Sequence, residues 1–246
     1  TSQLNTLTTV QFQSINSAAL STISTLNISK LSTTQINNLT DTQLLAMTSS
    51  QIGGLSTQQL GQLDGTRLST LSANQIKGLI TNQITSLTTA QLTSINPNAI
   101  AKINTLQLSA LNSQMLGSFS TSQLKSLAPD VLKTLSTDQI AGLTTSQIAA
   151  LTTAQTKSLT STQLNGLSTT QLAAIGTSDI VAIDGATLAK LNTTQIQALS
   201  VGQIKALKAS QVQVLGTSQV AALTTKQIQQ LNVDDIKALS ATQIAK

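Results

Sequence analysis

The 246-residue sequence contains no cysteine, histidine, tryptophan, tyrosine or glutamate. Without cysteine it cannot form a disulfide framework, a thiolate nucleophile or a cysteine-ligated metal site. Without histidine it lacks the usual proton shuttle near neutral pH and the commonest metal ligand. Charged residues make up only 9% of the chain, whereas globular proteins have roughly 25%. We therefore expect a protein that is not an enzyme, with no catalytic residues, no cofactor and no metal.

Long apolar runs and a strong charge of one sign are also missing. No run approaches the roughly 18 apolar residues of a membrane-spanning helix, so no transmembrane segment is expected. The net charge of +5 comes from 13 basic and eight acidic residues, and aromatic residues for stacking on bases are almost absent. A nucleic-acid partner is therefore not expected. Because the chain starts at Thr1 rather than methionine, we expect a processed chain or a fragment of a longer array.

What the sequence does contain is an octapeptide repeat without a phase shift. The octad Ser32 to Leu39 reads Ser-Thr-Thr-Gln-Ile-Asn-Asn-Leu, and Thr144 to Leu151 reads Thr-Thr-Ser-Gln-Ile-Ala-Ala-Leu. Twenty-nine complete octads run from Thr8 to Leu239, with seven residues on either side. Position eight is always apolar, position five is apolar except at Thr156, and position four is Gln in 22 of 31 cases. Such a period is the signature of a repeat architecture, so residues 1–246 are predicted to form one continuous solenoid of about 31 repeats.

Each octad is predicted to form one short helix. Ser/Thr-x-x-Gln before an apolar residue is the capping-box pattern, in which the hydroxyl accepts from position four and the Gln reaches back to position one. Both prolines, Pro97 and Pro129, fall at position two, the first helical residue, which tolerates proline. All eight Asp fall at positions one to four, and ten of 13 basic residues fall at positions six or seven. Acidic residues early and basic residues late in each octad complement the dipole of a helix. Since this arrangement repeats every eight residues, a new helix is predicted to begin in every octad.

Two alternatives to an all-α solenoid fit the octad pattern less well. In one continuous helix the apolar stripe would drift by about 80° per octad and face no constant direction. A straight strand would point positions five and eight to opposite faces, although a strand-and-corner unit could still stack into a β-solenoid. Helices of about six residues cannot stand alone. They are expected to pack on neighbouring repeats around a narrow Leu/Ile core, with the small position seven allowing close approach.

A longer period of 80 residues is superimposed on the octads. Position eight is Ile only in three pairs, each pair 80 residues from the next: Ile15 and Ile23, Ile95 and Ile103, Ile175 and Ile183. Position four loses its Gln at the same phase. Duplication of an 80-residue block explains this pattern, and so does a superhelical or assembly register with a special contact once per turn of ten octads.

Several features resemble binding sites but have simpler interpretations. The Gln and Ser/Thr ladders are interpreted as caps, and the lysines at positions six and seven as dipole complements. Asp234-Asp235 alone is a poor metal site and is interpreted as a charged first turn. Asp64-Gly65 and Asp184-Gly185 are interpreted as variants of the repeat start rather than phosphate loops. The Thr-rich position two has no obligatory cap role, so a regular Thr array that orders water, ice or glycans stays open.

Octads such as Thr144 to Leu151 and Thr224 to Leu231 resemble the Thr/Gln-rich tandem repeats of large bacterial surface or secreted proteins, often described as adhesin-like. The resemblance covers essentially the whole chain and implies an extracellular or cell-surface structural role. The chain is slightly basic, which departs from the acidic character of such proteins. We expect a rod, stalk or filament subunit whose partners are copies of itself end to end, or flanking repeats of a longer chain. The alternative is a binding module for surface glycans or ice.

Overall fold

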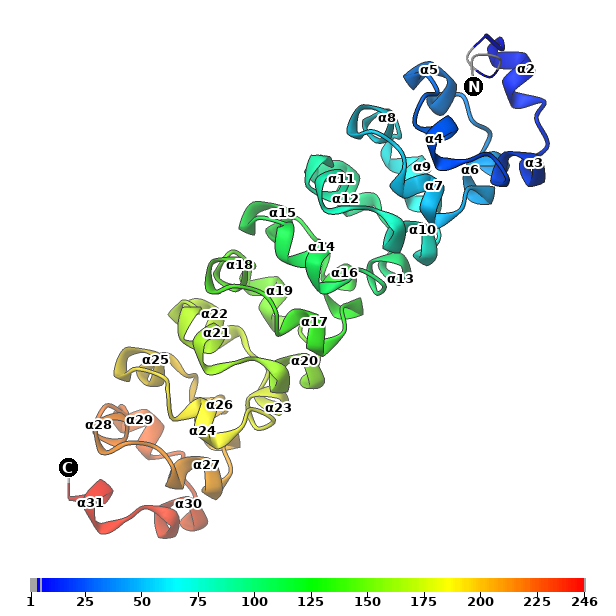
Figure 1. Cartoon of the computed structure of the whole chain (residues 1–246). Helices are drawn as coiled ribbons and strands as arrows, with labels where there is room; N and C mark the ends of the chain where they lie inside the picture. The colour runs from blue at the N-terminus through cyan, green and yellow to red at the C-terminus, as the bar shows by residue number, and fades with distance from the viewer. Residues whose placement is uncertain (1–3, 5, 246) are drawn as a thin grey trace. The chain divides into compact units, whose positions relative to one another are not determined.

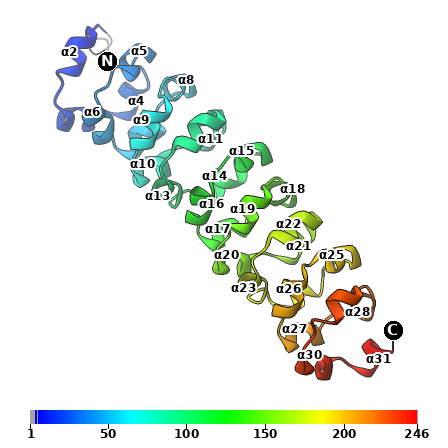
Figure 2. The same cartoon turned by 180° about the vertical axis from the view of Figure 1, so that it is seen from behind.

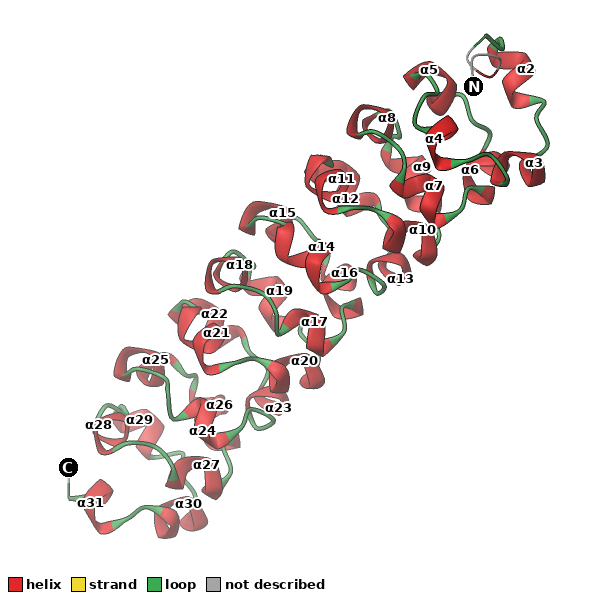
Figure 3. Cartoon of the chain, viewed as in Figure 1, coloured by secondary structure: helices red, strands yellow, loops and turns green. Residues whose placement is uncertain are grey.

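The computed structural model describes residues 4 and 6–245, and this part of the chain is helical without strands (Figure 3). It contains 30 short helices, α2 to α31, each of four to six residues. Almost every octad holds one helix, so the all-α prediction is confirmed and the β-solenoid alternative is wrong. The helices form two compact units, Thr1–Leu127 and Ala128–Lys246.

The first unit contains fifteen of these helices. They are α2 (Thr9–Gln13), α3 (Ser17–Ser21), α4 (Thr25–Ile28), α5 (Thr33–Asn37), α6 (Asp41–Ala46), α7 (Ser49–Gly53), α8 (Thr57–Gly61), α9 (Gly65–Thr70), α10 (Ala73–Gly78), α11 (Thr81–Ser86), α12 (Thr89–Ser94), α13 (Pro97–Ile100), α14 (Thr105–Ala110), α15 (Ser113–Gly117) and α16 (Thr121–Ser126).

The second unit contains the other fifteen. They are α17 (Pro129–Leu132), α18 (Thr137–Ala141), α19 (Thr145–Ala149), α20 (Thr153–Ser158), α21 (Ser161–Gly166), α22 (Thr169–Ala174), α23 (Thr177–Ile180), α24 (Gly185–Leu188), α25 (Thr193–Ala198), α26 (Val201–Ala206), α27 (Ala209–Gln213), α28 (Thr217–Ala221), α29 (Thr225–Ile228), α30 (Val233–Ala238) and α31 (Ala241–Ile244).

The helices begin where the octad pattern places them. Position one is the N-cap in extended conformation, and the helix starts at position two. Pro97 and Pro129 are the first residues of α13 and α17, where a missing N–H costs no hydrogen bond. Each helix stops after one or two turns. In α6 and α10 the residue at position eight, Met47 or Leu79, already has extended backbone. The predicted restart of the helix every eight residues is confirmed.

Within each unit the closest packing joins helices that are three apart in the chain. Helix α5 packs on α8 and α8 on α11 in the first unit, while α22 packs on α25 and α25 on α28 in the second. The same succession is visible along one side of each unit from the front and from behind (Figures 1 and 2). Hydrogen bonds from the Gln at position four also join octads to the fourth octad before them. One turn of the coil therefore holds between three and four octads.

This turn length bears on the 80-residue period. Ten octads span more than two turns of the coil. A superhelical or assembly register of ten octads and duplication of an 80-residue block both stay predictions. At this phase the first unit also carries two exposed leucines at position three, Leu26 and Leu106, with 62% and 73% of their surface exposed.

The core of each unit is built from positions five and eight. Leu20, Ile36 and Leu44 at position five of the first unit are fully buried, as are Leu132, Leu188 and Ile196 in the second. Position eight is nearly as well covered. Since an i, i+3 pair lies on one side of a short helix, both side chains of an octad point into the coil. Thr156, the one polar residue at position five, is also buried.

The tightest helix contact depends on two glycines. Helices α7 and α10 approach closely because Gly53 has no Cβ to overlap the carbonyl oxygen of Gly78. A Cβ on Gly78 would overlap the backbone of Ser49. We therefore expect Gly78→Ala to lower the free energy of unfolding by about 1–3 kcal/mol, the usual cost of overpacking. Urea denaturation followed by circular dichroism measures this loss.

Gly61 offers a matched control for this substitution. It also lies near the end of a helix, but a Cβ there would meet nothing within 4 Å. Gly61→Ala is therefore expected to be neutral or stabilising by up to about 1 kcal/mol, because alanine is the better helix former. Equal destabilisation by both substitutions would contradict the close contact between α7 and α10.

Candidate functional site

The most regular polar feature of the structure is the Gln at position four. In the octad of α8, the backbone N–H of Ser56 donates to Oε1 of Gln59 over 2.7 Å, and the N–H of Gln59 donates to Oγ of Ser56 over 3.1 Å. The same reciprocal pair recurs along the chain. At Ile80, Lys208 and Gly216 only the Gln half exists, because these residues have no side-chain acceptor. The capping interpretation of the Gln ladder is confirmed.

The other end of the same amide joins successive turns of the coil. Nε2 of Gln59 donates to the carbonyl oxygens of Ile28, Ser29 and Leu31, at 3.2, 3.3 and 2.7 Å. These three carbonyls, which we call the carbonyl triad, belong to positions five, six and eight of the fourth octad back. Two or three of the corresponding carbonyls accept from Gln43, Gln51, Gln75, Gln83, Gln91, Gln107, Gln123, Gln163, Gln171, Gln195, Gln203, Gln211, Gln219, Gln227 and Gln243.

Sequence reasoning missed this second role. Both ends of the amide are used, and the side chain is buried: Gln59 is 3% exposed and Gln203 is 1% exposed. The amino-acid composition is consistent with this donor role. Glu serves as well as Gln in a capping box, yet no Glu occurs in the chain. A carboxylate has no N–H to donate, so the predominance of Gln and the lack of Glu fit a donor role at position four, although Asp179 and Asp235 also occur there.

Arg67 shows that a positive charge can occupy the same place. Its Nη1 donates to the carbonyl oxygens of Ile36 and Asn37 at 3.2 and 2.6 Å, and its Nη2 donates to that of Leu39 at 2.7 Å. Burial lowers the pKa of this guanidinium below its ordinary value, and the charges of Asp41 and Asp64 oppose that shift. Arginine remains charged at neutral pH all the same.

We expect Arg67→Ala to cost about 2–3 kcal/mol of unfolding free energy, because three carbonyls lose their donor at roughly 1 kcal/mol each. Arg67→Gln restores the consensus amide and should stay within about 1 kcal/mol of the parent. Chemical denaturation of the two variants compares them directly. A similar loss for both would show that the arginine side chain acts through something other than the carbonyl triad.

In the described part of the chain, no group of three or more acidic residues could hold a metal ion. The carboxylates of Asp64 and Asp184 cap their own helices, accepting from the N–H groups of Arg67 and Thr187 at 2.9 and 3.2 Å. They are therefore variants of the repeat start, as predicted. Asp234 and Asp235 lie in the first turn of α30, also as predicted.

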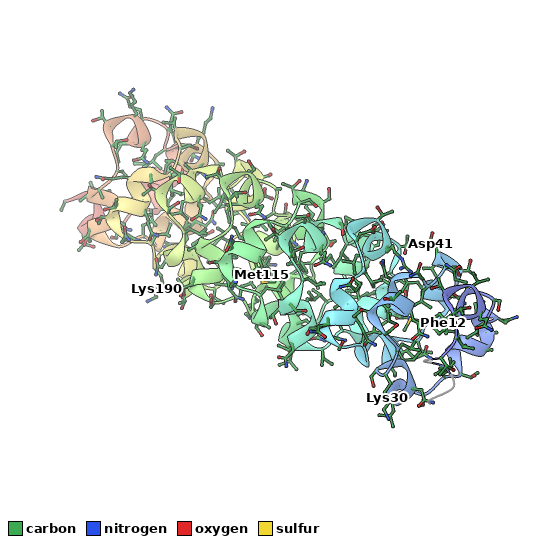
Figure 4. All side chains as sticks on the ribbon, turned by 90° about the horizontal axis from the view of Figure 1, so that it is seen from above. Phe12, Lys30, Asp41, Met115 and Lys190 are labelled. Carbon is green, nitrogen blue, oxygen red and sulfur yellow. The ribbon has the colours of Figure 1, made fainter. Side chains whose placement is uncertain are left out.

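The lysines lie on the surface. Lys30 and Lys190 are exposed and project from the ribbons of their own units (Figure 4). Lys77, Lys125, Lys157, Lys205 and Lys237 occupy the last turns of their helices, where a positive charge complements the dipole. Among the helices that the structure describes, none is long and apolar enough to pass through a bilayer.

The C-terminal end of the second unit presents an uncovered part of the core. At position five, Ile228, Ile236 and Ile244 are 40%, 44% and 62% exposed, whereas every position five from Phe12 to Val220 is buried. Together with Val220 and Leu231 they line a hollow of about 360 Å³. We call this surface the C-terminal face.

The N-terminal end of the first unit carries the complementary group. Gln11 makes the usual cap with Thr8, whose backbone N–H donates to Oε1 over 2.9 Å. Unlike Gln43 or Gln51, Gln11 has an exposed side chain. If another turn of the coil preceded this end, its carbonyl triad would lie next to Nε2 of Gln11. We call this surface, centred on Gln11, the N-terminal face.

Exposed threonines at position two form rows along the packed helices. In the first unit Thr57, Thr81 and Thr105 begin α8, α11 and α14, and these helices contact one another in that order. In the second unit Thr145, Thr169 and Thr193 begin α19, α22 and α25, which also pack in order.

Comparison with known proteins supports the repeat architecture. The family model of the ALTTAQ repeat matches residues 124–153, 172–209 and 202–233. Residues 150–155 read Ala-Leu-Thr-Thr-Ala-Gln, which spans positions seven and eight of one octad and one to four of the next. A search of curated proteins gives no match. The chain is thus a tandem-repeat protein with three segments that match the ALTTAQ repeat.

Proposed function

We propose that the protein is a non-catalytic structural element, a rod, stalk or filament subunit that extends by stacking end to end. The observation that carries this proposal is the C-terminal face, where three isoleucines of the core are uncovered. Exposed apolar patches of this kind mark interaction surfaces. The resemblance to bacterial surface repeats supports a location outside the cell or on its surface.

The two faces are complementary in register as well as in chemistry. Inside each unit, the Gln of one octad donates to the carbonyl triad of the fourth octad before it. Suppose that a second copy continues the octad lattice beyond Lys246. Its Gln11 then lies four octads after the octad that contains Ile228. Its Nε2 would then donate to the carbonyls of Ile228, Gln229 and Leu231. The same surfaces would suit flanking repeats in a longer chain.

Electron microscopy of the purified chain over a concentration series tests the proposal. We expect filaments whose number and length grow with concentration. Ile236→Lys combined with Ile244→Lys places two charges on the C-terminal face and should leave short particles only. Val201→Lys is the matched control, because Val201 is 40% exposed within the second unit and away from the C-terminal face. It should assemble like the parent.

Sedimentation velocity separates the outcomes further. One species at every concentration would overturn self-association and leave these faces to flanking repeats. Filaments that persist in the double lysine variant would place the association elsewhere on the surface.

The threonine rows favour a second candidate, a binding module for glycans or ice. Regularly spaced hydroxyls at Thr145, Thr169 and Thr193 offer repeated donors and acceptors on one side of the second unit. Thr169→Lys with Thr193→Lys should abolish thermal hysteresis or glycan-array signal if this candidate holds. A parent chain that gives neither signal excludes it.

A further inference from the structure

Asp235 is the one buried polar side chain among the described residues with an atom that lacks a hydrogen-bond partner. It stands at position four of the octad of α30, is 0% exposed, and its Oδ1 has no donor. A carboxylate oxygen left alone in the interior carries a large desolvation penalty. A partner for Oδ1 beyond the protein's own atoms would remove this penalty.

The octad register locates that partner. Oδ2 of Asp235 accepts from the backbone N–H of Asn232 over 2.9 Å, just as Oε1 of Gln227 accepts from Thr224 over 2.8 Å in the preceding octad. In Gln227 the other terminal atom, Nε2, faces the carbonyl triad of Ile196, Gln197 and Leu199. Oδ1 of Asp235 accordingly takes the place of Nε2.

The corresponding carbonyl triad for Asp235 comes from Ile204, Lys205 and Leu207, at the end of α26. The carboxylate oxygen and the carbonyl oxygens are all hydrogen-bond acceptors, so no hydrogen bond can form between them. Aspartate is also one methylene shorter than Gln, which widens the gap by roughly 1.5 Å. The octad register therefore places one buried carboxylate oxygen opposite three carbonyl oxygens.

The chain itself shows that a carbonyl triad accepts a monovalent cation. Arg67 places its guanidinium against three carbonyls in the first unit. Close to Asp235, the basic residues Lys205, Lys208 and Lys237 are all exposed, and none of them donates to Oδ1. A small ion in this gap would neutralise the carboxylate without adding net charge.

We propose that Asp235 and the carbonyl triad of Ile204, Lys205 and Leu207 bind a sodium ion. The ligands are all hard oxygens, the set that hard cations prefer. One negative charge matches one monovalent ion, so the buried site becomes neutral. The ion ties α30 to the end of α26, as the Gln amide does in the other turns.

Hydrogen exchange of the full chain in different chloride salts tests this site. Amide exchange in residues 201–207 and 233–238 is expected to be several-fold slower in sodium chloride than in choline chloride at equal ionic strength. The effect should saturate with sodium concentration. Residues 140–170, far from Asp235 in the chain, provide the internal reference and should exchange equally in both salts.

Two variants make the assignment specific. Asp235→Gln restores the consensus amide, so it should fold and exchange slowly in either salt, with no sodium dependence. Asp234→Asn removes the neighbouring exposed carboxylate and should keep the full sodium dependence. Equal exchange of the parent in both salts would overturn the proposal. So would a sodium dependence that survives in Asp235→Gln, because the ion would then bind elsewhere.

Discussion

Gln59→Glu is expected to lower the free energy of unfolding by about 3–5 kcal/mol. The amide of Gln59 donates to the carbonyls of Ile28, Ser29 and Leu31, and each lost hydrogen bond costs roughly 1 kcal/mol. The new carboxylate also faces these carbonyls in a site that is only 3% exposed. Leaving a buried charge without a partner costs several kcal/mol in other proteins. Gln59→Glu keeps the size of the side chain and its capping bond with Ser56. It should nevertheless be among the most destabilising substitutions in the chain.

The neighbouring residue provides a control with the same change of charge. Gln58 is exposed at position three of the same helix. Gln58→Glu should be neutral or stabilising by up to about 1 kcal/mol, because a negative charge suits the first turn of a helix. Urea denaturation of both variants at neutral pH gives the comparison.

The loss at position 59 should also depend on pH. Burial beside carbonyl oxygens raises the pKa of the introduced carboxyl group in the folded state. Its penalty is then complete above that raised pKa and shrinks as the pH falls towards the unfolded value near 4.3. A protonated carboxyl can again donate to a carbonyl. Equal stability of the two Gln→Glu variants at neutral pH would show that the amide does not link the turns.

The local structure follows directly from the octad pattern. Ser56 and Gln59 predict a capped helix start because both partners of the capping box lie within four residues of each other. Pro97, Pro129 and the placement of Asp and Lys confirm the same boundary independently. These interactions are short-range, and so the pattern of one octad contains all of their partners. The buried positions five and eight follow for the same reason.

The coil itself could not be predicted in this way. Whether an octad packs on its second, third or fourth neighbour depends on backbone angles summed over several short helices, and no residue type marks that distance. The link from Gln59 to Leu31 spans 28 residues and appears only once the turn is known. The predominance of Gln fits a donor role at position four, but it does not show where the acceptors lie. The roles of Arg67 and Asp235 likewise depend on the carbonyl triad of another octad, which the sequence alone does not identify.

Leu143→Asp is expected to cost about 5 kcal/mol or more. Leu143 occupies position eight after α18 and is 3% exposed. Its carbonyl accepts from Nε2 of Gln171 over 2.6 Å. Losing a buried leucine costs about 2–5 kcal/mol, and an unpaired buried carboxylate adds to this. Since each repeat is held by the turns before and after it, the octads packed around residue 143 should unfold before the rest.

Leu106→Asp makes the same chemical change at a side chain that is 73% exposed, and it should stay within about 0.5 kcal/mol of the parent. Hydrogen exchange resolved along the chain is the decisive measurement. In Leu143→Asp the helices α18 and α21, which pack on each other, should lose protection while α5 and α8 of the first unit keep it. Uniform loss across both units would instead mean that the array unfolds in one cooperative step. That result would also explain how a core only two residues wide per octad keeps the whole chain folded, because every repeat would then share the stability of all the others.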